Sequence, residues 1–440
     1  MEQVKKKRIR PRERDAVIQS LRAGVTPRAG IQHIQVGRRR EIEAMLKDIE
    51  RIGDGGTAFR LIIGAYGSGK SFFLQLVRLI AQEKGLVTVH ADLSPDRRLH
   101  ATGGQARGLF AELMKNAATR AKPAGNALPS IVERFLTEAA KEADQTGSEV
   151  EAVIHQRLEH LSELVGGYDF AKVIAAYREG HETDNHQLTN DAVRWLRGEF
   201  STKTDARKQL GVRVIIDDAR FYDQLKLLSL FVRQAGYKGL LVNLDEMVNL
   251  YKLNNKKARE SNYEQILRML NDSLQGGSEG LGFLMGGTPE FLLDPRKGLY
   301  SYEALQSRLA ENRFANQAGV VDYSATALHL ANLTPEELYL LLCNIRHVFA
   351  AGDPANYLLP DEALTQFLSH CANRIGEAYF RTPRNTIKAF VDLLSLLEQD
   401  QQLDWGELIG RVELKPELQS DMPDSTPAGQ GDDELSSFQL

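Results

Sequence analysis

The sequence predicts an α/β protein in which helices cover both faces of a mostly parallel β-sheet. Short apolar runs, each about the length of one strand, alternate with segments of helical periodicity. The runs are apolar throughout, which is typical of parallel strands buried on both faces. In residues 61–77, "LIIGAYGSGKSFFLQLV", a strand passes through a glycine-rich loop directly into a helix.

The first elements surround this loop. Residues 15–24 predict a short helix that ends at Gly24, since Pro27 blocks its continuation. Residues 36–37 close an extended piece, and the next helix carries apolar residues at helical spacing: Ile42, Met45, Leu46 and Ile49. Residues 86–92, "LVTVHAD", form the second predicted strand.

A helical insertion follows at about residues 94–210. Helical periods recur there between glycine and proline punctuation, without a fixed repeat length. The segment is much longer than a connection between two strands needs to be.

The alternation of strands and helices then returns. Residues 239–246, 280–292 and 327–333 predict three more strands. Three helices follow at 335–351, 360–375 and 383–398, the first opened by a threonine and a proline in capping positions.

The length of 440 residues is enough for two or three compact domains. We expect a basic N-terminal extension (1–30), a nucleotide-binding core (31–333), a C-terminal helical lid (334–412) and an acidic disordered tail (413–440). The tail is polar and rich in proline and glycine, which disfavours a packed core.

Composition excludes several classes of protein. No apolar run approaches the roughly 20 residues of a membrane helix, and no apolar segment follows the basic N-terminus as in a secretory signal. Cys343 and Cys371 lie in helical segments and are expected as buried small hydrophobes, which fits a reducing cytoplasm. The net charge of −4 makes the whole molecule a poor electrostatic partner for DNA.

Basic residues nevertheless gather in two segments. Residues 1–14 carry seven lysines and arginines against two glutamates, so they could hold phosphates or could be a solvated terminus. Residues 95–107, "PDRRLHATGGQAR", are a second candidate for nucleic-acid contact, with a solvated loop as the alternative.

The glycine-rich loop matches the phosphate-binding pattern G-x-x-x-x-G-K-[ST] in full. Its glycines let backbone N–H groups approach phosphate oxygens, and the helix that follows directs its positive end to the same place. Lys70 is expected to reach the β- and γ-phosphates and Ser71 to bind Mg²⁺. The expected ATP-binding residues are Gly64, Ala65, Tyr66, Gly67, Ser68, Gly69, Lys70, Ser71 and Phe72.

Two acids end a buried strand downstream, in "LLVNLDEMV". Asp245 suits coordination of Mg²⁺, directly or through water, and Glu246 suits positioning and deprotonation of an attacking water. Asn243 is unusual within such a strand; it could be a satisfied buried amide or could help to position Asp245.

Later polar residues are weaker candidates. Thr288 could place a hydroxyl near the γ-phosphate or could simply cap a helix. Arg308, with Arg313 as the alternative, could reach the nucleotide of a neighbouring subunit or lie on the surface. Arg384 opposes the dipole in the first turn of its helix, which indicates a role such as phosphate binding; Arg381 is the alternative.

Together these motifs resemble those of AAA+ ATPases, in particular the clade of origin-recognition initiators and STAND-type ATPases. "QVGRRREIEAM" resembles the adenine-side box of that clade, which implies Val36 and Gly37 near the base. Residues 64–71 match its Walker A motif, and Asp245 with Glu246 match its Walker B motif.

The same resemblance implies roles for the weaker candidates. Thr288 stands at the position of sensor 1, and Ser307-Arg308 resembles the arginine-finger box. Arg384 resembles sensor 2, although Thr382 replaces the usual glycine. The stretch after Arg384 is too short for the winged-helix DNA-binding domain of the initiators, so any nucleic-acid contact must come from elsewhere.

A closer resemblance covers most of the chain. Residues 14–38, the glycine loop and "ADLSPDRRLHATGGQARGLFAELM" look like the ATP-binding proteins of bacterial phage-exclusion (BREX) systems, of the BrxD type. That resemblance implies an ATPase in phage defence, commonly encoded beside a superfamily 2 helicase, with other defence proteins as partners.

Three functions follow as hypotheses. The first is an ATP-driven homo-oligomer that acts on DNA, with Arg308 acting in trans. The second is a nucleotide switch that rarely turns over and binds a helicase or effector through its insertion. The third is a DNA-transposition-type target selector, which "GGTPEF" also resembles.

Overall fold

The computed structural model describes residues 9–375, 383–400 and 402–411. Its centre is a five-stranded sheet in the order β2-β3-β4-β1-β5, and each neighbouring pair is parallel. The strands are β1 (Ala58–Ile63), β2 (Val87–Asp92), β3 (Leu240–Asp245), β4 (Leu281–Gly287) and β5 (Ala327–His329). The prediction of a parallel α/β sheet flanked by helices is confirmed.

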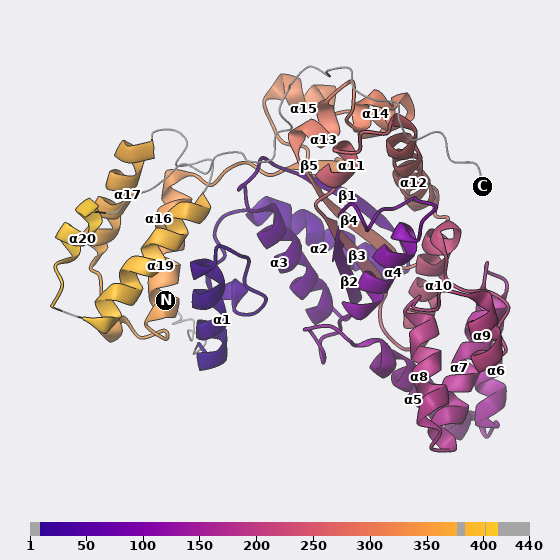
Figure 1. Cartoon of the computed structure of the whole chain (residues 1–440). Helices are drawn as coiled ribbons and strands as arrows, with labels where there is room; N and C mark the ends of the chain where they lie inside the picture. Colours follow the sequence, from indigo (N-terminus) through magenta and orange to yellow (C-terminus); the bar gives the residue numbers. More distant parts are fainter. Residues whose placement is uncertain (1–8, 376–382, 401, 412–440) are drawn as a thin grey trace, which may run out of the picture.

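The alternating side chains of each strand pack against two different layers. On one face, Ala58 and Ile62 of β1 pack in a cluster with α2 and α3. On the other face, Phe59 and Leu61 join a larger cluster with the helices that follow β2 and β3 (Figure 1). The helices beside the sheet are α2 (Arg39–Gly53), α3 (Lys70–Glu83), α10 (Phe221–Gln234), α11 (Val248–Tyr251) and α12 (Lys256–Gln275).

The long segment between β2 and β3 is helical, as the sequence predicts. It contains α4 (Gln105–Lys115), α5 (Leu128–Thr146), α6 (Val150–Ser162), α7 (Gly167–Glu182), α8 (His186–Leu196), α9 (Lys203–Leu210) and the short η2 (Asp218–Arg220) before α10. Figure 1 shows α5 to α9 gathered at one end of the molecule, beyond α10.

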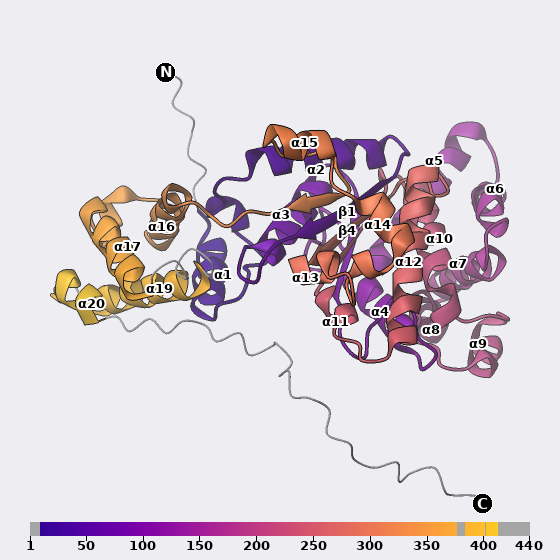
Figure 2. The same cartoon turned by 90° about the horizontal axis from the view of Figure 1, so that it is seen from above.

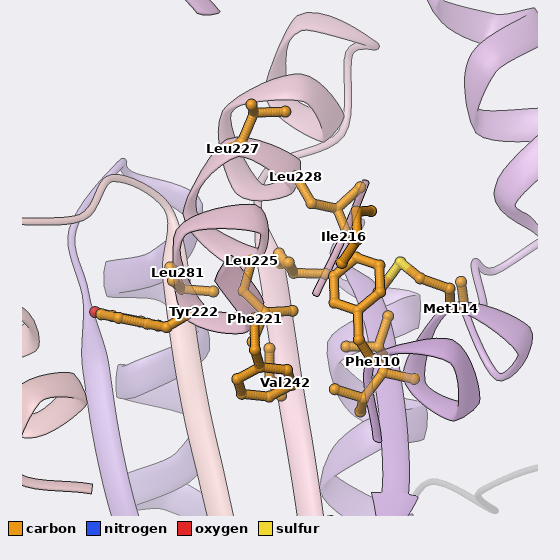
Figure 3. Packing of buried hydrophobic residues seen from close by; sticks show 14 of the residues in the cluster. Phe110, Met114, Ile216, Phe221, Tyr222, Leu225, Leu227, Leu228, Val242 and Leu281 are labelled. Atoms are coloured by element: carbon orange, nitrogen blue, oxygen red, sulfur yellow. The ribbon is translucent and has the colours of Figure 1, made fainter. Parts of the chain in front are cut away.

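These helices share one hydrophobic core with the sheet. Phe110 of α4 and Phe221 of α10 pack together above Val242 of β3 (Figure 3). Farther out, Phe231 of α10 has its ring centroid 5.1 Å from that of Phe135 on α5. The insertion is therefore an extension of the core rather than a separately packed body.

Short helices connect the later strands. After β4 come α13 (Pro289–Leu293), η3 (Leu299–Ser301), α14 (Glu303–Leu309) and α15 (Arg313–Ala318). In Figure 1 they lie on the side of the molecule that carries β5, and η3 contacts both α13 and α14.

The C-terminal helices form a second body with the N-terminal helix α1 (Pro11–Arg22). This C-terminal helical unit comprises α1, α16 (Pro335–Phe349), η4 (Pro354–Asn356), α17 (Asp361–Ile375), α19 (Pro383–Gln399) and α20 (Trp405–Arg411). Val17 and Leu21 are buried in the same cluster as Leu342 and Phe390. Figure 2 shows the unit set to one side of the sheet, with α1 on its inner side.

Residues of the basic N-terminal segment take part in this packing. The Arg14 side chain donates to the Phe349 carbonyl oxygen over 2.7 Å and to Glu398 over 2.9 Å. Helix α1 begins four residues before the predicted start because Pro11 suits the first helical position. Residues 1–8 and the predicted tail at 413–440 lie outside the described residues.

Across the residues described here, no helix combines the length and apolar character needed to cross a membrane.

Candidate functional site

The glycine loop joins β1 to α3 through two left-handed residues. Gly67 has φ 78° and Gly69 has φ 85°, and Gly69 is the residue that precedes the first turn of α3. A side chain at either position would strain the backbone. The first turn of α3 thus begins at Lys70, with N–H groups that have no partner within the helix. Such N–H groups, with the positive end of the helix dipole, bind anions.

The same loop folds back on itself around Lys70. The Lys70 Nζ donates to the carbonyl oxygens of Gly64, over 2.8 Å, and Ala65, over 3.0 Å. A Cβ at Gly64 would lie 2.4 Å from the Ser68 Oγ, so only glycine fits there. The backbone of the loop therefore forms a concave site of a shape that fits a phosphate chain. Side chains in place of its glycines would fill that space.

Ser71 meets an acid from a distant part of the chain. Its Oγ donates to the Asp245 Oδ2 over 2.6 Å, which joins the start of α3 to the end of β3. Gly286 on β4 makes room for this acid, because a Cβ there would lie 2.4 Å from the Asp245 Oδ1. A hydroxyl and a carboxylate form a suitable partial ligand set for Mg²⁺, which takes its remaining ligands from phosphate oxygens and water.

A metal at this point would depend on such outside ligands. Among the described residues, no group of three or more His, Cys, Asp or Glu side chains has an arrangement that could hold a metal ion. The donor set at Ser71 and Asp245 fits Mg²⁺ bound together with a nucleotide, not a resident metal centre.

Glu246 follows directly in a left-handed conformation with φ 56°, which is uncommon for a residue with a side chain. Its N–H donates to the Asp245 Oδ1 over 2.8 Å. The surrounding protein raises the pKa of Glu246 by desolvation, and the charges of Asp245 and Asp92 raise it further, while Lys70 opposes them. A carboxylate with a raised pKa beside a phosphate site suits a general base.

Desolvation lowers the pKa of Lys70, and the charges of Asp245, Glu246 and Glu290 work against this effect. The ammonium thus lies among three acids, and its charge compensates theirs. A phosphate chain near Lys70 would take over part of that pairing.

Thr288 begins the next helix after β4. Its Oγ1 accepts a hydrogen bond from the Phe291 N–H over 3.4 Å, so it caps α13. Because β4 lies between β3 and β1 in the sheet, Thr288 follows the strand that separates the acids from the glycine loop. The capping role is observed, and the sensing role stays a prediction.

Arg384 extends from α19 to the glycine loop. Its Nη1 donates to the Tyr66 Oη over 3.2 Å, and its Nε donates to the Gly24 carbonyl oxygen over 2.6 Å. The structure therefore brings this residue to the loop from the C-terminal helical unit. The alternative, Arg381, lies outside the described residues, as does Thr382.

The residues expected near the base lie between the core and the C-terminal helical unit. Val36 and Phe72 pack at the edge of that unit's apolar cluster. Gly37 has φ 60°, and a Cβ there would lie 2.0 Å from the Glu337 Oε1 at the start of α16. A nucleotide base in this position would contact both bodies.

The sequence model of the BREX system ATP-binding protein family BrxC/D matches residues 9–413. The chain belongs to this family. No curated protein matches it. The family description, together with the glycine loop, gives a nucleotide-binding protein of a phage-defence system that takes ATP as its ligand.

In this BrxC/D family member, the two candidate arginine fingers lie away from the chain's own glycine loop. The Arg308 Nε donates to the Asn271 Oδ1 over 2.7 Å, and its Nη1 donates to the Ala304 carbonyl oxygen over 2.8 Å. Arg313 is exposed at the start of α15. Their roles as arginine fingers stay predictions.

Two residues at the site of this BrxC/D protein were missed in the sequence. Arg38 has φ 56°, and its Nη2 donates to the carbonyl oxygens of Ser68, over 2.6 Å, and Ala331, over 2.9 Å. Asp92 ends β2 directly beside Asp245 in the sheet register. An acid at the carboxyl end of a predicted parallel strand is a signal that could have revealed Asp92; nothing local distinguishes Arg38 from its arginine neighbours.

Proposed function

We propose that this protein is an AAA+ ATPase of phage defence, which binds ATP with Mg²⁺ in the glycine loop and hydrolyses it. The observation that supports this most is the 2.6 Å hydrogen bond between Ser71 and Asp245, two residues 174 positions apart. It unites the helix start that binds phosphate with the strand end that carries the acids.

In the mechanism that we propose, the Lys70 Nζ leaves the carbonyl oxygens of Gly64 and Ala65 for the β- and γ-phosphates. The N–H groups of the loop bind the same phosphates from the backbone side. Mg²⁺, held by Ser71 and Asp245, would neutralise charge on the β- and γ-phosphate oxygens.

Glu246 then accepts a proton from the water that attacks the γ-phosphate. Its raised pKa makes it a better proton acceptor than an ordinary glutamate near neutral pH. Thr288 orients that water or a γ-phosphate oxygen. Arg384 moves from Tyr66 to the phosphates and so couples the C-terminal helical unit to the nucleotide.

Transition-state charge requires a further cation, which we assign to Arg308 of a second copy of the chain. ATP would then bridge two subunits, and activity would depend on oligomer formation. Within a defence system, such an oligomer would act with a helicase or other partner proteins on DNA, in the cytoplasm.

The alternative is a nucleotide switch of low turnover. The contact of Arg384 with both Tyr66 and Gly24 favours it, since it connects the C-terminal helical unit to the loop without requiring hydrolysis. The experiment below separates the two functions.

The test is the Glu246→Gln variant. We expect ATP binding, measured with a fluorescent ATP analogue, to be retained, and turnover to fall by about 10²–10⁴-fold, the range for loss of a general base. Glu264→Gln, on the exposed side of α12, is the matched control and keeps full activity. Turnover equal to the parent's would disprove the assignment, and negligible turnover of the parent itself would favour the switch.

A further inference from the structure

Arg78 of α3 is a buried cation whose partner is a neutral histidine ring. Its exposed fraction is 3%, and its Nη1 contacts the Nδ1 of His90 on β2 and lies 3.0 Å from the Nε2 of the same ring. The Nε of Arg78 is buried without a hydrogen-bond partner. Within the described ranges, no carboxylate forms a salt bridge with this guanidinium. Burying a charged group is costly unless it is paired and hydrogen-bonded.

The other buried arginines of the described chain differ from Arg78, since each donates to at least one oxygen. The pairs are Arg60 with Asp48 at 2.6 Å, Arg346 with Asp361 at 2.5 Å, and Arg259 with the Leu253 carbonyl at 2.7 Å. Arg346 also has a buried Nε with no hydrogen-bond partner among the described residues, so Arg78 differs from the other buried arginines in having only the neutral ring of His90 as a partner.

Arg28 adds a second cation at the same place. It is exposed in the loop after α1, and its carbonyl accepts a hydrogen bond from the Gln75 Nε2 over 3.4 Å. Gln75 and Arg78 are three residues apart and so lie on one face of α3. Burial, and then the charge of Arg28, lower the pKa of Arg78 to about 10.

His90 contributes no charge to this cluster. Burial lowers its pKa to about 3, and the charges of Arg78 and Arg28 add to the effect. At neutral pH the ring is uncharged, so the cluster carries the positive charges of two arginines, and the charge of Arg28 also acts on Asp92 at the end of β2.

Arg78 itself lies away from the glycine loop. Arg78 comes eight residues after Lys70 on the same helix, which is about 12 Å along the helix axis. Its partner His90 lies on β2, which is an edge strand of the sheet. A phosphate group in the glycine loop would therefore not satisfy Arg78.

We propose that Arg28 and Arg78 bind a phosphate group outside the nucleotide site. The planar guanidinium of Arg78 offers a fork of N–H donors that matches phosphate oxygens, and its unpaired Nε is one of them. Arg28 would complete the site from the solvent side. The phosphate could come from a nucleic-acid backbone or from a free phosphate ion, and the site does not depend on ATP hydrolysis.

Thermal unfolding in increasing inorganic phosphate tests the site directly, with chloride at equal ionic strength as the reference. We expect the Tm of the full chain to rise with phosphate because ligand binding stabilises the folded state. The rise should persist in Lys70→Ala, which weakens the glycine loop, and disappear in Arg28→Ala. Arg411→Ala removes an exposed arginine of α20 and should respond like the parent. A rise that survives in Arg28→Ala, or that is lost in Lys70→Ala, would overturn the proposal.

Arg78→Met gives an independent test. Replacing an unpaired buried cation by an apolar side chain of similar length should leave the Tm unchanged or raise it in phosphate-free buffer. The same variant should show no response to phosphate. A lower Tm in phosphate-free buffer would mean that Arg78 acts only as a structural partner of His90 and would count against the site.

Fluorescence anisotropy with labelled duplex DNA identifies the source of the phosphate. If the source is nucleic acid, Arg28→Ala should reduce the slope of log affinity against log salt by about 0.9, the value of one phosphate contact, for any sequence. The ligand is a free phosphate if the Tm of the parent responds to phosphate while the parent and Arg28→Ala have the same salt slope for DNA binding.

Discussion

At the scale of single residues, the site depends on side chains held by unusual backbone. Glu246 and Arg38 both have φ 56°, a region in which residues with a Cβ are strained. Glu246 is fixed there by its own N–H bond to Asp245, and Arg38 by two carbonyl partners. Strain of this kind persists where neighbouring bonds impose it, and here it holds Glu246 beside Asp245 and Arg38 on the glycine loop.

The pH dependence of turnover is the prediction at this scale. A base must be deprotonated, so activity is lost as pH falls through its pKa, and the pKa of Glu246 lies above the ordinary value of 4.5. The acidic limb of kcat/KM should therefore lie above that value. Asp92→Asn removes one charge that raises this pKa, so the limb should move to lower pH. A limb that stays in place or moves up would contradict the assignment of the base.

At the scale of elements, α15 and the loop after it present apolar side chains to solvent. Phe314 is 82% exposed, and Val320 and Val321 are 60% and 57% exposed. They follow α14, which carries Arg308. Exposed apolar patches of soluble proteins commonly mark interfaces, and Phe314 follows Arg308, the residue that we expect to act on a second copy, by six positions in the sequence.

Phe314→Ser is the prediction at this scale. If α15 packs against a second copy, the substitution removes the burial of one aromatic side chain, which contributes about 1.5–3 kcal/mol to association. The protein concentration for half-maximal ATPase activity should then rise by about tenfold or more. Leu274→Ser, at an apolar residue of α12 that is 63% exposed, is the control. Equal half-maximal concentrations for the parent and Phe314→Ser would exclude α15 from the interface.

At the scale of the whole molecule, α1 belongs with helices from the other end of the sequence. It contacts α16 and α19, and its buried residues complete their apolar cluster. The C-terminal helical unit is therefore built from both sides of the sheet in sequence: α1 precedes the strands, and α16 to α20 follow them.

Leu21→Ala tests this arrangement. The substitution should destabilise the C-terminal helical unit by about 2–5 kcal/mol, the usual cost of truncating a buried leucine. Hydrogen exchange should then become faster in α16 and α19, with the strands unchanged. Gln19→Ala, on the exposed face of α1, should have no such effect. Faster exchange confined to α1 would show that the helix does not support its neighbours.

The sequence was informative where contacts are local. The strand–loop–helix pattern at residues 61–77 and the apolar strands predicted the parallel sheet, because period and turn chemistry are local signals. The contact of Ser71 with Asp245 is not local. It could be expected because the two acids end a later parallel strand, downstream of the glycine loop. The packing of α1 on α19 could not be predicted, because an amphipathic helix does not encode which of several apolar surfaces it covers.

Two stretches of chain connect the C-terminal helical unit to the sheet: residues 23–38, after α1, and residues 330–334, before α16. Arg384 donates a hydrogen bond to the first stretch, at the Gly24 carbonyl oxygen, and Arg38 donates one to the second, at the Ala331 carbonyl oxygen. A body joined at two points can turn about the line between them but resists sliding or twisting. Arg384 and Arg38 also contact the glycine loop, at Tyr66 and Ser68, so the line between the two connections passes beside that loop. Any rotation about this line would displace α17 and α20 more than α1, because Figure 1 shows α17 and α20 on the side of the unit away from the sheet.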